Sequence, residues 1–446
     1  MNTPICDFIK KYAESEPLRL HMPGHKGVSL LGAEGIDLTE IDGADDLFHA
    51  SGIIRESEKN ASELFGADTF YSTEGSSLCI RAMLYLALLY AKEKGIPPVI
   101  AAGRNAHKTF LSAVALLDIT VDWIYPQNED IYVSCNITPD ELDDFLTKSN
   151  AFAVYLTSPD YLGNVLDIKA LSEVCHAHSV LLLVDNAHGA YLKFLSPSRH
   201  PIDLGADMCC DSAHKTLPAL TGSAYLHVSK NSPSIFAENA KNALAFFAST
   251  SPSYLILQSL DAVNGYLSRG YKERLSTFLG EVKSRKELLS AHGYSFFGNE
   301  PLKLTVNAKA YGYTGTELAD LLLKENAVCE FHDPDVLVMM LTPEIGVSGL
   351  DRLVKILLNI PRKEPISMLP PRIERLEAVL SPREAFLSPS ESISSKKSLG
   401  RVLSNASFGC PPAVPMIISG ERISENTLQL FEYYGIEEVN VIKCLK

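Results

Sequence analysis

The sequence lacks any apolar run long enough to cross a membrane. The longest such run, residues 82–91, is far shorter than the roughly 20 residues that a membrane-spanning helix needs. The first seven residues contain no basic stretch followed by an apolar one, so they do not resemble a secretory signal. We therefore expect a cytoplasmic protein with no membrane partner.

A basic surface and paired cysteines are also missing. The 54 acidic residues outnumber the 40 basic ones, and the net charge of -14 argues against nucleic acid as a partner, because phosphate binding needs a basic surface. The nine cysteines are odd in number and form no CxxC pair. We expect reduced thiols and no metal site.

Short apolar runs alternate with amphipathic segments over residues 60–230, which predicts an α/β fold with a mostly parallel sheet covered by helices. The predicted strands are 99–102, 121–125, 152–156, 180–184, 208–210 and 224–228. The expected parts of the chain are an N-terminal segment (1–55), a large domain (56–290) and a smaller C-terminal α+β domain (291–446).

The amphipathic stretch 254–289 is expected to link the two domains. In the C-terminal part, the pattern predicts strands at 302–306, 336–341 and 414–418, helices at 316–324 and 349–358, and connections at 361–371 and 387–398.

Two predicted strands are followed by residues that could share one ligand. Asp185 directly follows the run 180–184, and Lys215 lies shortly after the run 208–210. Ligands of open α/β sheets bind at the carboxyl ends of the strands. A carboxylate there can pair with a protonated pyridine nitrogen, and a lysine can form a Schiff base with an aldehyde, so the pair suggests pyridoxal phosphate. Taken singly, such an Asp is usually a turn residue and such a Lys a surface charge.

A phosphate site and a stacking ring are also predicted. Gly75, Ser76 and Ser77 precede a helical pattern that runs to residue 94, and such a turn offers amides and hydroxyls to a phosphate at the positive end of the helix dipole. A plain serine cap is the alternative. His107 follows the strand 99–102 and could stack on the cofactor ring, or could instead cap a helix or face solvent.

In all these places the chain resembles the Orn/Lys/Arg decarboxylase family of fold type I pyridoxal phosphate enzymes. The resemblance covers residues 20–230 densely and the tail thinly. It is carried by His21-Met22-Pro23-Gly24-His25-Lys26-Gly27, Asp45-Asp46-Leu47, Gly75-Ser76-Ser77, Arg104-Asn105-Ala106-His107-Lys108, Asp185-Asn186-Ala187-His188 and Ser212-Ala213-His214-Lys215.

The resemblance implies a large domain of the fold type I kind with a seven-stranded type of sheet, and a homodimer or assembly of dimers with the N-terminal segment at the interface. Lys215 is implied as the Schiff-base lysine, Asp185 as the partner of the ring nitrogen and His107 as the stacking residue. The residues implied to surround the cofactor are Gly75, Ser76, Ser77, Ala187, His188, Ser212 and His214.

The implied reaction is decarboxylation of an amino acid, most readily a basic one. Lys215 or His214 would return the proton to the α-carbon. Asp45, Asp46 and His25 are candidates to bind the substrate, and turn or surface roles are as plausible for the two aspartates. The same residues could serve an aminotransferase or a lyase, or a non-catalytic homologue that only binds the cofactor.

The tail departs from the family pattern, so the resemblance does not determine which amino acid is the substrate. The family motif Pro-Tyr-Pro-Pro-Gly-Ile-Pro is replaced by a stretch that includes Gly409 and Ala413, and Asn405 stands where an acidic residue is frequent.

Overall fold

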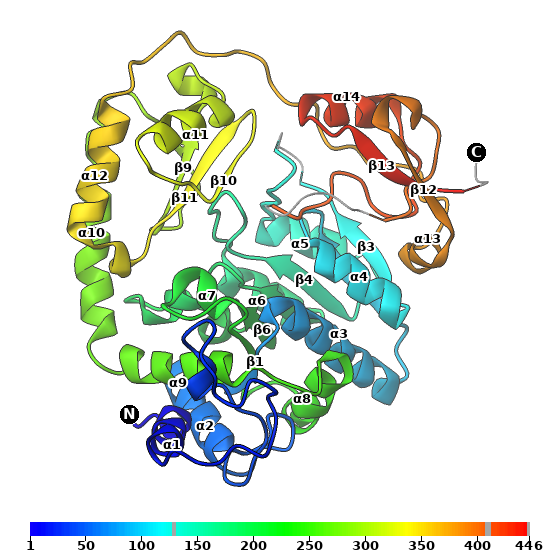
Figure 1. The fold of residues 1–446 in the computed structure, drawn as a ribbon. Helices are drawn as coiled ribbons and strands as arrows, with labels where there is room; N and C mark the ends of the chain where they lie inside the picture. The colour runs from blue at the N-terminus through cyan, green and yellow to red at the C-terminus, as the bar shows by residue number, and fades with distance from the viewer. Residues whose placement is uncertain (127–130, 406–411, 444–446) are drawn as a thin grey trace. The chain divides into compact units, whose positions relative to one another are not determined.

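A computed structural model describes residues 1–126, 131–405 and 412–443. Its largest sheet has seven strands in the order β1-β7-β6-β5-β4-β2-β3, and β1, β3, β4 and β6 are labelled in Figure 1. The strands are β1 (Asp68–Ser72), β2 (Val99–Gly103), β3 (Thr120–Ile124), β4 (Ala153–Thr157), β5 (Leu181–Asp185), β6 (Met208–Asp211) and β7 (Ala224–Val228).

The sheet is mostly parallel, as predicted. Strands β5 and β6 are parallel, and β2 is parallel to both β3 and β4, whereas β7 is antiparallel to β1 and β6. The α/β fold class is therefore confirmed. Strand β1 was not predicted, because it mixes polar and apolar residues as edge strands do and has no apolar run.

The chain forms two compact units, one of residues 1–96 and 168–274 and the other of residues 97–167 and 275–446. The expected division at residues 55 and 290 stays a prediction. None of the helices in the described ranges is both long and apolar enough to span a membrane.

The first unit contains helices of four to 20 residues. They are α1 (Pro4–Glu14), α2 (Ile53–Phe65), α3 (Gly75–Lys94), α6 (Ile168–Ala177), α7 (Ala213–Thr216), α8 (Ser234–Phe247) and α9 (Tyr254–Leu267), with short 3-10 turns η1 (Glu34–Ile36), η2 (Ala190–Phe194) and η3 (Pro201–Leu204). Helix α3 packs along α8 (Figure 1). It ends at Gly95, which adopts the left-handed conformation, after Lys92 and Lys94 in its last turn.

The second unit adds two antiparallel sheets. The four-stranded one has the order β10 (Phe331–His332), β11 (Val336–Met340), β9 (Lys303–Asn307) and β8 (Phe296–Phe297), and the other pairs β12 (Ser390–Ser394) with β13 (Glu438–Ile442). Its helices are α4 (Lys108–Leu117), α5 (Pro139–Leu146), α11 (Gly315–Lys324), α12 (Gly346–Leu358), α13 (Pro382–Leu387) and α14 (Glu425–Tyr433), with the short turns η4 (Lys309–Tyr311), η5 (Pro343–Ile345) and η6 (Ser395–Lys397).

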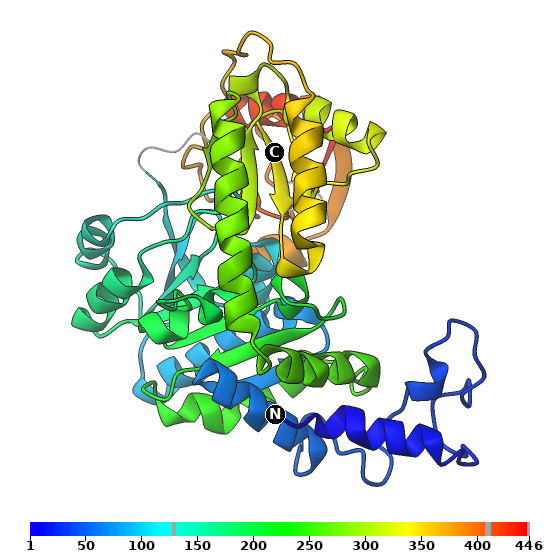
Figure 2. The same cartoon turned by 90° about the vertical axis from the view of Figure 1, so that its left-hand side faces the viewer.

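Helix α10 (Tyr271–Ala291) lies beside α12, as Figure 2 shows, and an ion pair between Arg285 and Asp351 joins them at 3.0 Å. The stretch 254–289 thus forms two helices, α9 and α10. They are separated at Gly270, whose φ of +69° breaks the helical path.

Two predictions for the tail were wrong. The stretch 414–418 is no strand, although Val414, Ile417 and Ile418 are buried in apolar clusters. The stretch is apolar because its side chains are buried. Its backbone carbonyls at Pro415 and Met416 accept hydrogen bonds from the guanidinium of Arg104 and not from a neighbouring strand in the described part of the chain. Conversely, the stretch expected to be a connection contains β12, whose serine-rich residues pair with β13 on an exposed surface.

Candidate active site

The carboxyl ends of β5 and β6 bring an acidic residue, Asp185, and a basic residue, Lys215, to one edge of the sheet. All five residues of β5 are buried, and its last residue, Asp185, pairs with Cys210 of β6. Asp185 is only 3% exposed, and its carboxylate accepts hydrogen bonds from the amide of Ala187 at 3.2 Å and the thiol of Cys210 at 3.7 Å. The carboxylate is thus held at the strand end by its own turn.

Lys215 reaches the same edge from β6. The chain turns after Ser212 into the single-turn helix α7, and Nζ of Lys215 lies 3.0 Å from Nε2 of His188, which follows β5. His188 is buried. An imidazole at this distance can form a hydrogen bond with the amine and accept a proton from it, which suits an amine that must act as a nucleophile.

The amino end of α3 faces the segment that carries Lys215. Ser212 Oγ donates to Ser76 Oγ at 2.8 Å, and the amide of Gly75 donates to the carbonyl of Gly222 at 2.8 Å. Gly75 has a φ of +70°, and a Cβ placed there would meet nothing within 4 Å. The helix end, next to Ser77, is therefore a suitable place for an anion.

His107 is placed in the second unit as the N-cap of α4. Its Nδ1 accepts the amide hydrogen of Thr109 at 3.1 Å, so the ring proton of the neutral form is on Nε2. This is the helix-capping role that the sequence allowed. A stacking role for His107 stays a prediction.

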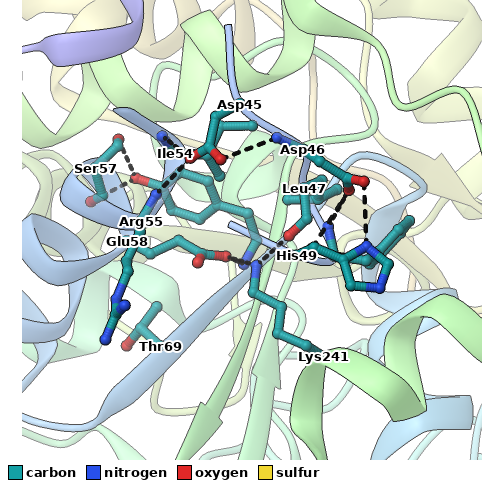
Figure 3. A network of polar contacts seen from close by, with 12 residues as sticks. Asp45, Asp46, Leu47, His49, Ile54, Arg55, Ser57, Glu58, Thr69 and Lys241 are labelled. Atoms are coloured by element: carbon teal, nitrogen blue, oxygen red, sulfur yellow. Dashed lines mark hydrogen bonds and ion pairs between the residues drawn. The ribbon is translucent and has the colours of Figure 1, made fainter. Parts of the chain in front are cut away.

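Asp45 and Asp46 organise the loop before α2 (Figure 3). The carboxylate of Asp45 accepts the amide hydrogens of Asp46, Ser51, Gly52 and Ile54 at 2.8–3.0 Å. Burial opposes its ionisation, but these amides outweigh burial and lower the pKa of Asp45. The turn role allowed for Asp45 is thus observed, and a substrate contact stays a prediction.

The other two substrate candidates also have local partners. Asp46 accepts from the amide of Phe48 at 2.8 Å and from Nδ1 of His49 at 3.2 Å. His25 lies 3.2 Å from Asp37 and accepts from the amide of Gly27. A substrate contact of Asp46 or His25 stays a prediction.

Replacing Asp45 by alanine is expected to lower the free energy of unfolding by about 2 kcal/mol, because the loop and the start of α2 lose their shared acceptor. The φ of +74° at this position adds strain for alanine. Urea denaturation of this variant and of Asp46→Ala measures the effect, and Asp46→Ala should cost less, since Asp46 holds fewer amides. Unchanged stability of Asp45→Ala together with a raised KM would instead favour a substrate contact.

The tail residues that depart from the family pattern lie in the second unit. Asn405 accepts a hydrogen bond from Asn440 at 3.2 Å, and the carbonyl of Ala413 accepts from the amide of Lys108 at 2.8 Å. Ala413 has a φ of +56°, a conformation that favours the glycine expected there. Gly409 lies outside the described residues.

The sequence did not predict a buried polar cluster centred on Asp211, the last residue of β6. Asp211 contacts His200, His227 and the side chain of Asn186. Asn186 and Asp211 lie inside or beside the motifs, but nothing in the spacing of the two histidines indicates that they meet. Their only sequence signal is that each is a polar residue next to apolar ones.

Comparisons with known proteins found a matching family, similar proteins and similar solved structures. The family described as Orn/Lys/Arg decarboxylase, major domain, matches residues 3–299. An arginine decarboxylase of Halalkalibacterium halodurans is 31% identical, over 96% of this chain and 92% of that protein, and one of Bacillus subtilis is 30% identical with the same coverage. The structure of lysine decarboxylase A from Pseudomonas aeruginosa superposes with a TM-score of 0.80 at 17% identity, covering 99% of this chain and 80% of that one, and this supports the fold.

Proposed function

The chain belongs to the Orn/Lys/Arg decarboxylase family, and from this premise we propose that it converts arginine to the corresponding amine with pyridoxal phosphate bound at Lys215. The family is pyridoxal phosphate-dependent and decarboxylates basic amino acids. The choice of arginine among them is supported by relatives of that name along nearly the whole chain. The observation that carries the proposal is the meeting of Lys215 and His188 beside the strand that ends at Asp185.

The residues present fit the cofactor. The hydroxyl of Thr216, next to Lys215, is buried and has no hydrogen-bond partner within the described ranges, and the same holds for Ser223 Oγ. A phosphate would supply acceptors to such hydroxyls, and the paired Ser76 and Ser212 lie at the amino end of α3. The space above Gly75 leaves room for it.

The site residues have distinct roles toward the cofactor. Lys215 would hold the cofactor through its aldehyde, and Asp185 would pair with the ring nitrogen. His107 would be the stacking residue, and Ala187 and His188 would lie near the ring. The residues that would hold the phosphate are Gly75, Ser76, Ser77, Ser212 and His214. These roles carry over from the family to the matching positions of this chain.

The protein moves protons at two atoms. When bound, the cofactor supplies an electron sink for the pair left behind as carbon dioxide departs. His188 accepts or returns the proton of Lys215 Nζ, from which it is 3.0 Å away. Lys215 or His214 delivers a proton to the α-carbon of the product, and the carbonyl of Ser223, 3.0 Å from His214 Nδ1, orients that second imidazole.

We further propose a homodimer, or an assembly of dimers, in the cytoplasm. The segment between α1 and α2 extends from α1 in Figure 2 and exposes apolar side chains that a single copy leaves uncovered. The most exposed ones are Leu18, Leu20, Leu30 and Leu31. A second copy of the chain is the proposed partner of this surface.

The decisive experiment offers the cofactor-loaded protein arginine, ornithine, lysine, and neutral and acidic amino acids in parallel. We expect carbon dioxide and the matching amine in equal amounts, with the highest kcat/KM for arginine. Release of a keto acid would indicate an aminotransferase, and loss of a side-chain fragment would indicate a lyase. A protein that shows the visible band of bound cofactor but no product from any amino acid would be a binding homologue.

A further inference from the structure

The buried carboxylate of Asp211 accepts hydrogen bonds from three side chains next to the proposed site. Oδ2 of Asp211 accepts from Nε2 of His200 and from Nε2 of His227, each at 3.1 Å, and Oδ1 accepts from Nδ2 of Asn186 at 2.6 Å. All four side chains are fully buried. We call these four residues the Asp211 cluster.

Three hydrogen-bond donors hold the buried carboxylate of Asp211. Burial raises the pKa of Asp211, but His200 and His227 more than offset it and leave that pKa below its ordinary value. Burial lowers the pKa of His227 more than Asp211 raises it, so His227 is neutral. Nε2 of His200 faces a carboxylate oxygen, which can only accept, so Nε2 is the donor, and Nδ1 is buried without a partner among the described residues.

The cluster is attached to both strand ends that carry the site. Asn186 directly follows Asp185, and Asp211 directly precedes Ser212 in the segment of Lys215. The amide of Asn186 also donates a hydrogen bond to the carbonyl of Cys210, at 3.0 Å. One main-chain and one side-chain hydrogen bond of Asn186 therefore connect the two strand ends.

The turn around Asn186 has no spare room. The carbonyl of Asn186 accepts from the amide of Gly189 at 2.7 Å, and a Cβ on Gly189 would lie 2.0 Å from Asn186 Oδ1. A residue larger than glycine at position 189 would therefore collide with the Asn186 side chain and disturb the turn between Asp185 and His188.

We propose that the Asp211 cluster is a positioning device that sets the distance between Asp185 and Lys215, and so the fit of the cofactor between them. This inference rests on the proposed function. Asp211 touches neither substrate nor cofactor in this arrangement and acts through Asn186 and through the chain that leads to Lys215.

A metal ion is the other occupant that these side chains could suit. His200, Cys209 and Asp211 offer donor atoms within 4.8 Å of one another, and Cys209 Sγ lies 3.9 Å from His200 Nε2. A histidine that binds a metal normally donates its other ring nitrogen to an acceptor, and Nδ1 of His200 has none in the described part of the chain. The geometry therefore favours hydrogen bonds.

The test compares Asp211→Asn with a matched variant, Asp207→Asn, in the full chain. Asp207 is also buried and accepts from the amide of Leu182 at 2.8 Å and from Nε2 of His176 at 3.1 Å, but it lies just before the other end of β6. We expect Asp211→Asn to raise the dissociation constant of pyridoxal phosphate roughly tenfold or more, because an amide cannot accept from all three donors. Asp207→Asn should lower Tm without changing that constant.

The visible circular dichroism of bound cofactor gives a readout besides activity, since it reports the asymmetry of the pocket. We expect Asp211→Asn to weaken or alter this signal and to lower kcat more than it changes KM. Asn186→Ala cuts the side-chain link while leaving both histidines on Asp211, so it tests the same point if Asp211→Asn does not fold.

The outcomes are separable. A lowered Tm in Asp211→Asn or Asn186→Ala, with cofactor affinity and dichroism like those of the wild type, would make the cluster merely structural and overturn the inference. One equivalent of a bound metal in the purified wild type would also overturn it. A wild type that binds no pyridoxal phosphate at all would overturn the proposed function and, with it, this inference.

Discussion

Lys215→Ala is expected to lower kcat by on the order of 10⁴-fold, because one side chain both bonds the cofactor and handles a proton at the reacting carbon. The visible absorption band of the cofactor bound to lysine should vanish in this variant. Borohydride reduction of the wild type should fix the cofactor's mass on the peptide that contains Lys215, and mass spectrometry locates it.

The matched control is Lys230→Ala, because Lys230 is an exposed lysine just after β7. It should keep both the band and the activity. Tm values of the two variants near that of the wild type would show that neither change unfolds the protein. A reduced cofactor found on any other lysine would contradict the assignment of Lys215.

Asp185→Asn is expected to lower kcat by about 10² to 10⁴-fold while the cofactor still binds. An amide matches the carboxylate in shape but cannot hold a proton on the ring nitrogen, so the electron sink is weakened. Steady-state kinetics with the best substrate, together with the absorption spectrum of the loaded protein, measure the effect.

A cofactor methylated on the ring nitrogen separates charge from packing, since its positive charge is permanent. It should restore part of the activity of Asp185→Asn, whereas it should not help the wild type. Asp207→Asn, which changes a buried carboxylate before the far end of β6, should keep full activity with the ordinary cofactor. Equal activity of Asp185→Asn and wild type would contradict the role of Asp185.

The order of elements could be predicted wherever an apolar run had to be buried in the sheet. Strands β5 and β7 were placed within about a residue for this reason. The stretch 414–418 was misassigned because burial also makes an irregular segment apolar, and the carbonyls that a strand would pair are here satisfied by Arg104. Pattern alone cannot tell these two kinds of burial apart.

The site was predictable in part. Asp185 and Lys215 each follow a strand, and parallel neighbours bring such residues to one edge. The meeting of Ser212 with Ser76, 136 residues away, was implied only by resemblance. The contacts of His200 depend on how the chain bends through η3, whose geometry no residue pattern specifies.

The Asp211 cluster also restricts how this sequence can change over time. Replacing Asp211 would leave two buried imidazoles and an amide without their hydrogen-bond acceptor. Replacing one donor would leave a buried charge with fewer partners, so each single replacement lowers the stability of the fold. A lineage that abandons this arrangement must therefore exchange several of the four positions together. We expect Asn186, His200, Asp211 and His227 to be inherited or lost as a set, whatever amino acid the protein decarboxylates.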